Sequence, residues 1–559
     1  MDRKWWTLIA GCTGTFMLLL DVTVVTVALP AIQRSLHSSF ADLQWVIDAY
    51  SITLASFLLT AGVVGDMFGR RRLFASGLAI FSASSLACGL STNPLMLNLM
   101  RGVQGVGGAI MFATSLALIA QVFSGKERGT AFGIYGAVLG GAVAVGPLIG
   151  GALTSGIGWR WIFLVNVPIG LVTIAITLTK VVDSKDPTRR RVDWIGFITF
   201  SASLFMLVFA LVEGNSKGWS SPPIVLLLVG AAVLMGVFLI AEWLGSDPML
   251  DLALFRRPAM VGVSLTAFTI SGSIFAMFLY LTLYMQDVLG YGPWAAGIRF
   301  LPITMLSFIV APFAGKLTVR VHSRYLMGLG MMLIALGCKL MTHIQPNSNW
   351  TVLLPGFIVA GIGVGFTNPV LAAATVSVVP PQRSGMSSGS SNTFRLVGIA
   401  TGIAVLGAVF LSEIRAYTAN ALAATPGGRL VLAHGGSRLF ASLAGGGIRE
   451  TAAVIPIAAA RNALVNAYTV GFTNTFNHLM TIATVVAFVG AVGALALVRQ
   501  RDFVPSVSPV VDEQAPAPGS GDQAQAPADS RPAPVPVPDF YESSLPGSLR
   551  GPRHRIRSR

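Results

Sequence analysis

The stretch Gly62-Val63-Val64-Gly65-Asp66-Met67-Phe68-Gly69-Arg70-Arg71-Arg72 joins an apolar segment to three consecutive arginines. Its glycines permit a tight turn and close helix packing, so the stretch predicts a helix end followed by a short loop. Asp66 can accept hydrogen bonds from free N–H groups at a helix start, or pair with an arginine. We interpret Gly62, Asp66, Gly69, Arg70, Arg71 and Arg72 as a conformational latch. For the arginines, an ordinary loop anchor is the alternative.

The composition around this stretch indicates a membrane protein. Of 559 residues, 53% are hydrophobic and only 11% are charged, and the mean hydropathy is +0.72. Soluble domains carry about 25% charged residues, and large exposed apolar patches drive association. We therefore predict an all-α integral membrane protein. The net charge of +15 is spread over short loops and the C-terminal end, which argues against a nucleic-acid partner.

Apolar segments long enough to cross a bilayer recur along the chain. A transmembrane helix needs about 20 apolar residues. The first segment lacks a small-residue cleavage site, so we interpret it as a retained helix rather than a signal peptide. The pattern predicts fourteen transmembrane helices, at residues 5–29, 43–65, 73–91, 95–122, 129–154, 160–182, 194–213, 223–244, 260–286, 297–320, 325–344, 351–379, 385–411 and 470–498.

The distribution of basic residues predicts the orientation of these helices. The loops on the side of the N-terminus hold most of the Lys and Arg residues, whereas the short outer loops hold only Arg34, Arg160 and Lys217. The positive-inside rule then places both termini in the cytoplasm. Residues 412–469 become a long outer loop rich in Ala and Gly, in which residues 450–468 are a candidate amphipathic helix. Residues 502–559, rich in Pro, Ser, Gly and Ala, become a disordered tail whose basic end is either inert or in contact with anionic lipid.

Three ionisable residues lie inside predicted helices, where lipid makes a charge costly. At about 1.5 Å per residue, Asp21, Asp48 and Arg101 all fall in the outer half of the membrane. Two acids and one arginine at one depth indicate a buried network with a spare negative charge, which can bind a proton reversibly. We therefore predict proton coupling at these three residues. Equal depth does not establish contact, so the alternatives are a static ion pair that locks helices, and Asp48 as a helix cap.

Four segments resemble signatures of the major facilitator superfamily. Residues 62–72 resemble its loop 2–3 signature, with Val64 and Gly65 in place of Leu and Ala. Residues 21–30 resemble the helix 1 signature of its fourteen-helix drug:proton antiporters, of the EmrB/QacA type. Residues 101–107 resemble the helix 4 signature, whose arginine is implicated in proton coupling. A fourth segment resembles the helix 5 antiporter signature through Gly136, Gly140, Gly146, Pro147, Gly150 and Gly151.

The resemblance implies the major facilitator fold, with two six-helix halves and two inserted helices. A degenerate copy of the latch at residues 315–324 agrees with an internal repeat, since Val319 stands there in place of Asp66. The expected parts are an N-terminal half at 1–192, inserted helices at 193–258, a C-terminal half at 259–501 that contains the loop 412–469, and the tail 502–559.

The second half offers little chemistry for protons. No Asp or Glu occurs between Asp287 and Glu413, so the first half must carry any coupled proton. Arg395 lies deep in a helix rich in Ser and Gly, where it can face a cavity.

The resemblance also implies a function: proton-coupled efflux of lipophilic or aromatic small molecules, such as drugs or antibiotics, by alternating access. A dedicated exporter of one self-made metabolite or antibiotic, and a non-transporting membrane sensor or scaffold, are the alternatives. An enzyme is not expected, because the sequence has no nucleophile–base constellation, metal-ligand cluster or phosphate-binding loop. We expect no metal or cofactor, with a lipophilic substrate, protons and lipid as partners. The chain should be a monomer in the plasma membrane.

Overall fold

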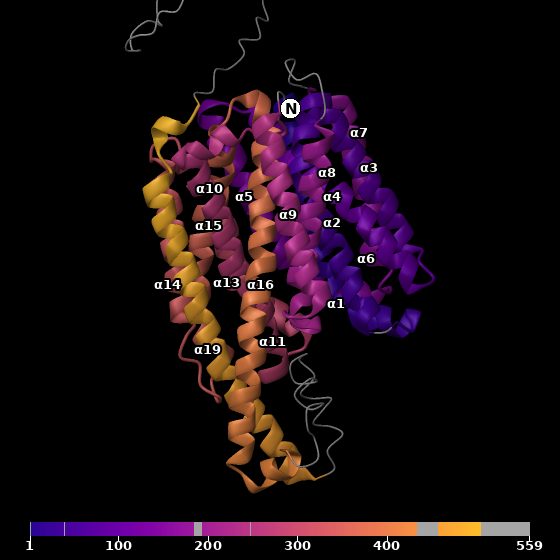
Figure 1. Ribbon diagram of the computed structural model, residues 1–559, viewed down its shortest axis with the longest axis vertical. Helices are drawn as coiled ribbons and strands as arrows, with labels where there is room; N and C mark the ends of the chain where they lie inside the picture. Colours follow the sequence, from indigo (N-terminus) through magenta and orange to yellow (C-terminus); the bar gives the residue numbers. More distant parts are fainter. Residues whose placement is uncertain (1, 39, 184–192, 246–247, 433–456, 505–559) are drawn as a thin grey trace, which may run out of the picture. The chain divides into compact units, whose positions relative to one another are not determined.

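The computed structural model describes residues 2–38, 40–183, 193–245, 248–432 and 457–504. Within these ranges every long element is a helix, and most helices run along one common direction (Figure 1). The first half contains α1 (Arg3–Leu36), α2 (Phe40–Phe68), α3 (Arg70–Gly89), α4 (Pro94–Val122), α5 (Gly125–Gly156), α6 (Trp161–Leu164) and α7 (Asn166–Lys180). Two further helices follow, α8 (Trp194–Lys217) and α9 (Pro222–Leu244).

The second half has more interruptions. Its α-helices are α10 (Pro258–Ile270), α11 (Ala276–Leu283), α12 (Pro293–Arg299), α13 (Leu301–Leu317), α14 (Ser323–Leu340), α15 (Leu354–Ser377), α16 (Ser384–Ala423) and α19 (Ala458–Leu497). Two π-helical segments, η2 (Ser271–Phe275) and η3 (Tyr284–Val288), flank α11. Short 3₁₀ turns are η1 (Leu252–Arg256), η4 (Trp350–Leu353), η5 (Pro381–Arg383) and η6 (Gln500–Asp502).

The prediction of an all-α membrane protein is confirmed, and the helix count agrees with fourteen. Twelve of the described helical segments are long and apolar enough to cross a membrane. The other two predicted spans correspond to α5, which has 32 residues, and to α13, an apolar helix of 17 residues. α13 is short because Phe300 separates it from α12.

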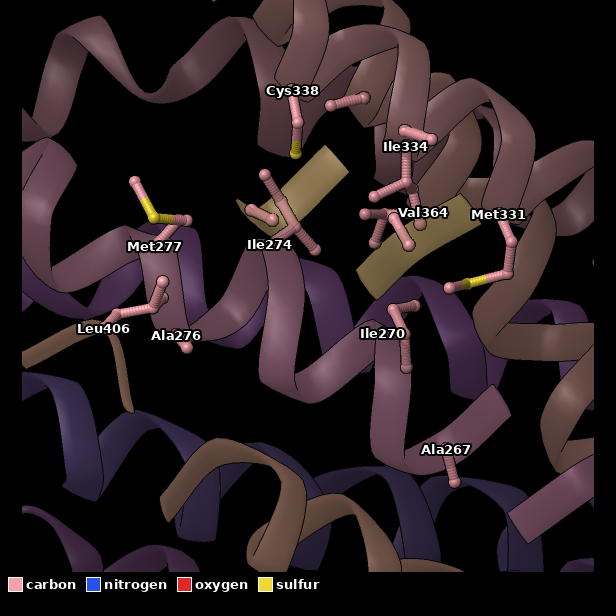
Figure 2. Close-up of a cluster of buried hydrophobic side chains, with 14 of the residues drawn as sticks. Ala267, Ile270, Ile274, Ala276, Met277, Met331, Ile334, Cys338, Val364 and Leu406 are labelled. Carbon is pink, nitrogen blue, oxygen red and sulfur yellow. The ribbon is translucent and has the colours of Figure 1, made fainter. Parts of the chain in front are cut away.

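Each half has its own apolar core. In the first half α4 packs against α1, α2 and α3. In the second half α14 packs against α15 and α19, and Figure 2 shows part of the core there. Ile270 and Ile274, from α10 and η2, meet Ile334 and Cys338 of α14 in that cluster. The two halves meet where α2 packs on α16 and where α5 packs on α13 and α15.

The inserted helices lie at the edge of this arrangement. α8 packs against α9, α2 and α16. α9 is apolar on all sides and mostly exposed. Only 17% of its most apolar 18-residue stretch is buried by the rest of the protein. A helix without a polar face and without a protein partner on most sides requires lipid as its neighbour. α8 therefore mediates the contact between this pair and both halves.

The region predicted as the outer loop 412–469 is helical at both ends. α16 continues to Ala423 and α19 already begins at Ala458, so residues 412–423 and 458–469 are helical. Hydropathy falls after residue 411, but the Ala-rich sequence still favours a helix. The two extensions run beyond the other helices (Figure 1), and the extension of α16 packs on α19, with Thr418 against Gly471. The predicted tail lies outside the described residues after Val504.

Candidate functional site

Arg101 and Asp21 form a buried ion pair between α4 and α1. Arg101 Nη1 donates to Asp21 Oδ2, and both side chains are 1% exposed. Arg101 Nε donates to the carbonyl of Val46 in α2 at 2.9 Å, and the guanidinium lies 4.2 Å from the ring centre of Tyr50. Arg101 thus joins three helices of the first half.

Two amide side chains complete the surroundings of Asp21. Gln104 Nε2 donates to Asp21 Oδ1 at 3.0 Å, and Asn166 Nδ2 lies 3.5 Å from the same oxygen. Gln104 Oε1 also accepts from Arg101 Nη1 at 2.9 Å. Both carboxylate oxygens of Asp21 are therefore occupied. Sequence reasoning assigned no role to these amides, although a buried amide inside an apolar helix is itself a signal of a polar network.

Asp48 lies outside this network. Within the described part of the chain no ion pair joins it to Arg101, and its buried Oδ2 has no hydrogen-bond partner. Tyr50, which faces Arg101, is two residues further along α2, and two residues turn a helical side chain by about 200°. Asp48 therefore points away from Arg101. It is also not a helix cap, because α2 already begins at Phe40.

The neighbour of Asp48 is an acid on the inserted helix α8. Asp48 and Glu213 are close enough to interact electrostatically, and each is 8% exposed. Glu213 Oε2 also pairs with Lys217 Nζ at 3.2 Å. Two carboxyl groups that approach each other in a buried site disfavour double ionisation. Glu213 was not among the predicted site residues, since its sequence position only marks it as lying near a helix end.

A cavity of about 420 Å³ lies between α2, α4 and α8. Trp45, Ala49 and Ile52 line it from α2, and Phe205 lines it from α8. Trp45 and Ile52 share a helix face with Asp48, because they lie three and four residues from it. Asp48 and Glu213 themselves do not line the cavity.

Asp66 connects the two halves at the end of α2. Its Oδ1 accepts from Arg70 Nε at 2.8 Å and from the backbone N–H of Gly385 at 3.0 Å. Its Oδ2 accepts from the N–H of Met386 at 2.8 Å. These amides belong to the first turn of α16, where free N–H groups and the helix dipole favour an anion. Asp66 thus has both kinds of partner that the sequence suggested, namely free N–H groups at a helix start and an arginine.

The arginines of the latch divide between the halves. Arg70 Nη2 donates to the carbonyls of Pro381 and Gln382, at 2.8 and 2.9 Å, just before α16. Arg71 and Arg72 instead approach Asp183 of the first half, at 4.0 and 3.5 Å. Arg70 therefore holds the second half, whereas the next two arginines hold the end of the first half.

Glycines make the latch contact possible. A β-carbon on Gly62 would overlap the carbonyl group of Gly385, so the α2 and α16 backbones touch there. Gly69 has a φ of 108°, a conformation that L side chains rarely adopt, and it forms the turn into α3. These positions tolerate no side chain without moving a helix.

The predicted antiporter segment lies along α5 and faces two different partners. A β-carbon on Gly136 would come 2.9 Å from Pro369 of α15, and one on Gly140 would come 2.8 Å from Ser307 Oγ of α13. Further along, Gly146 and Gly150 face Thr23 and Val24 of α1, whereas Gly151 has no neighbour within 4 Å. Pro147 lies within α5. The glycines therefore bring α5 close to α1 in the first half and to α13 and α15 in the second half.

The repeat of the latch in the second half lacks its acid. At the end of α13, Gly315 touches the backbone of Gly129 and Gly133 in α5. Thr318 Oγ1 only caps the carbonyl of Gly315, at 2.6 Å, and Val319 is exposed. The two junctions between the halves thus share close glycine packing, but only the α2–α16 junction carries a buried carboxylate.

This combination of two helical halves, a glycine-lined junction and a buried Asp–Arg pair agrees with the family comparison. The profile of the Major Facilitator Superfamily matches residues 11–403. The chain belongs to the Major Facilitator Superfamily. The resemblance read from the four segments is thereby confirmed, and the chain is a multi-pass membrane transporter rather than an enzyme.

Similar proteins come from actinobacteria. The chain is 36% identical over 411 residues to "Multidrug resistance protein Stp" of Mycobacterium tuberculosis, covering 73% of this chain and 76% of that protein. It is 33% identical over 420 residues to "Tetracenomycin C resistance and export protein" of Streptomyces glaucescens, covering 74% and 77%. The solved proton:xylose symporter XylE has a TM-score of 0.56 at 12% identity, covering 89% of this chain and 96% of that chain. That likeness supports the fold.

Proposed function

We propose that this transporter exports lipophilic or aromatic small molecules in exchange for protons, by alternating access. The observation that carries the proposal is Asp48, a buried carboxyl group that lies near Glu213 and has an oxygen without a hydrogen-bond partner among the described residues. Such a group can gain or lose a proton without breaking an ion pair. The names of the multidrug and antibiotic resistance relatives supply the substrate class and the direction of export.

In this mechanism the Asp21–Arg101 pair and Asp48 have different tasks. The pair fixes α1, α2 and α4 as one body, while proton exchange takes place at Asp48. The Asp66 latch favours the state in which α2 and the start of α16 are joined. Proton and substrate shift the equilibrium only through different affinities for the two states.

The proposal includes a setting and further partners. The chain lies in the plasma membrane as a monomer, with both termini in the cytoplasm. Lipid contacts the exposed faces of the inserted helices α8 and α9. The latch junctions then lie on the cytoplasmic side.

A dedicated exporter of one self-made metabolite is the second candidate. The relative named for tetracenomycin C resistance and export favours it, because that name refers to a single antibiotic. The two candidates share the latch and the acid pair and differ in how many substrates compete. Mutual competition among chemically unrelated antibiotics would support the multidrug form.

A sensor or scaffold that acts through the tail is the third candidate, and a truncation distinguishes it. Asp502 accepts from the N–H of Ala259, and the N–H of Val504 donates to the carbonyl of Ser377 at 2.8 Å. A cut after Val504 therefore keeps these contacts and removes the rest of the tail. Transport that survives this cut contradicts the scaffold.

The test of the proposal is efflux from proteoliposomes with an imposed proton gradient. Lipophilic dyes and antibiotics loaded inside are followed with and without an ionophore that collapses the gradient. We expect gradient-dependent export in the intact protein and its loss in Asp48→Asn. Export that ignores the gradient and persists in Asp48→Asn would mean a uniporter or another coupling ion.

A further inference from the structure

Arg395 lies in the first third of α16, with no acidic partner among the described residues. Within these residues its guanidinium makes one hydrogen bond, from Nη2 to Asn368 Oδ1 at 3.2 Å. No carboxylate of the described residues lies within 4.0 Å of it, and the ring of Phe275 is 5.8 Å from the guanidinium carbon. An arginine offers five N–H donors, and Arg395, which is half-buried, uses one of its nitrogens in this bond.

The amide beside Arg395 is also left with a free donor. Asn368 is 0% exposed, and its Nδ2 has no hydrogen-bond partner within the described residues. Its oxygen already accepts from Arg395, so only an acceptor can satisfy the remaining NH₂ group. A buried unsatisfied donor of this kind calls for a specific explanation.

The first half contributes a hydroxyl to the same place. Tyr135 of α5 interacts electrostatically with Arg395, and its Oη lies 3.2 Å from Ser115 Oγ and 3.4 Å from Thr15 Oγ1. The close approach of Gly136 to Pro369 places α5 directly against α15, next to Asn368. Tyr135, Asn368 and Arg395 therefore converge from both halves.

These groups lie at similar depth. At about 1.5 Å per residue, Tyr135, Asn368 and Arg395 lie roughly 14–17 Å from the helix ends at the latch junctions. This is about half of a hydrocarbon core of roughly 30 Å. Transporters of this architecture bind their substrates near the midplane, between the two repeats.

We propose that Arg395, Asn368 and Tyr135 form a substrate site for lipophilic organic anions, with an apolar body and a carboxylate, sulfonate or phenolate group. The guanidinium and the Asn368 NH₂ group donate to the anionic oxygens, and the Tyr135 hydroxyl donates from the other half. Asp21 and Asp66 do not compete for Arg395, since each is paired with an arginine of the first half. This inference rests on the proposed efflux function and specifies its substrate class.

The test measures binding of two xanthene dyes with the same ring system, an anionic fluorescein and a cationic rhodamine, by fluorescence anisotropy of the purified protein. We expect the intact protein to prefer the anion. Arg395→Gln should weaken anion binding about tenfold or more, since a charge-assisted hydrogen bond is lost, and should leave cation binding unchanged. Arg395→Lys should retain part of the preference. Asn368→Asp should abolish it, because the new carboxylate pairs with Arg395.

Arg299→Gln is the matched control. Arg299 is also partly buried without a carboxylate partner among the described residues, but it contacts Tyr291 and Trp350 near α12. Its substitution should leave both affinities unchanged. If Arg395→Gln does not fold, judged by gel filtration and thermal unfolding, then Arg395→Lys and Asn368→Asp decide the question.

Three results would overturn the site: a preference of the intact protein for the cation, unchanged anion binding in Arg395→Gln, or an unchanged preference in Asn368→Asp. Absence of binding for both dyes would overturn it as well. The efflux proposal fails separately, if dyes bind with the expected dependence on Arg395 but no dye is exported by a proton gradient.

Discussion

Arg101 and Arg395 are two arginines inside the bundle, one in each half, with opposite surroundings. Arg101 is paired with Asp21, supported by Gln104 and bonded to a backbone carbonyl. Within the described residues Arg395 donates to one acceptor, the amide oxygen of Asn368. A fully satisfied pair stabilises helix packing, whereas a cation with free donors is available to a ligand. In the proposed mechanism the first half therefore supplies rigidity and proton exchange, and Arg395 and Asn368 of the second half supply most of the substrate recognition.

The largest expected difference is in stability. Arg101→Ala leaves the Asp21 carboxylate buried without its cation, which should cost about 3–5 kcal/mol. Arg395→Ala removes one hydrogen bond and should cost about 1 kcal/mol or less. Denaturant unfolding of both variants in detergent measures the difference. Equal losses would contradict the assignment of a structural role to Arg101 alone.

A smaller effect concerns the packing that brings Tyr135 to Arg395. Gly136→Ala places a methyl group 2.9 Å from Pro369, and such overpacking typically costs about 1–3 kcal/mol. We expect lower thermal stability and weaker binding of the anionic dye. Gly151→Ala is the control, because nothing lies within 4 Å of the added carbon. If the two variants behave alike, the contact between α5 and α15 does not organise the site.

The smallest predicted change is at the latch, which joins the two halves without touching either arginine. Asp66→Asn keeps the shape, but its NH₂ group cannot accept the bond that one carboxylate oxygen now accepts, and the remaining bonds lose their charge assistance, a loss of about 1–2 kcal/mol. The joined state should become less populated. Spin labels at the exposed positions Phe68 and Tyr325 should show a broader distance distribution, extended to longer values. An unchanged distribution would mean that glycine packing alone holds this junction.

Much of the fold follows from the sequence because lipid imposes simple rules. Helix length, hydropathy and loop charge are local properties, and they predicted the spans and the latch. The sequence also predicted the kind of contact that Asp66 makes, with helix-start N–H groups and an arginine. The exact partner, the first turn of α16, could not be foreseen, because it is more than 300 residues away.

The candidate site shows where sequence reasoning stops. Asp21, Asp48 and Arg101 share a depth, but the rotation of α2 decides that Asp48 turns away from Arg101 and towards Glu213. Depth follows from residue counting, whereas rotation depends on packing. The continuation of α16 to Ala423 was missed for a related reason: hydropathy detects lipid contact and does not detect a helix that continues outside it. The roles assigned to the predicted site residues remain predictions.

The most direct test of the account is proton release on substrate binding, measured with a pH-sensitive dye in weakly buffered detergent solution. The intact protein, Asp48→Asn and Asp21→Asn are compared with a substrate that is exported in proteoliposomes. The account predicts release by the intact protein, none by Asp48→Asn, and continued release by Asp21→Asn at reduced stability. Undiminished release by Asp48→Asn, with loss in a folded Asp21→Asn, would contradict it and place proton exchange at the Asp21–Arg101 pair.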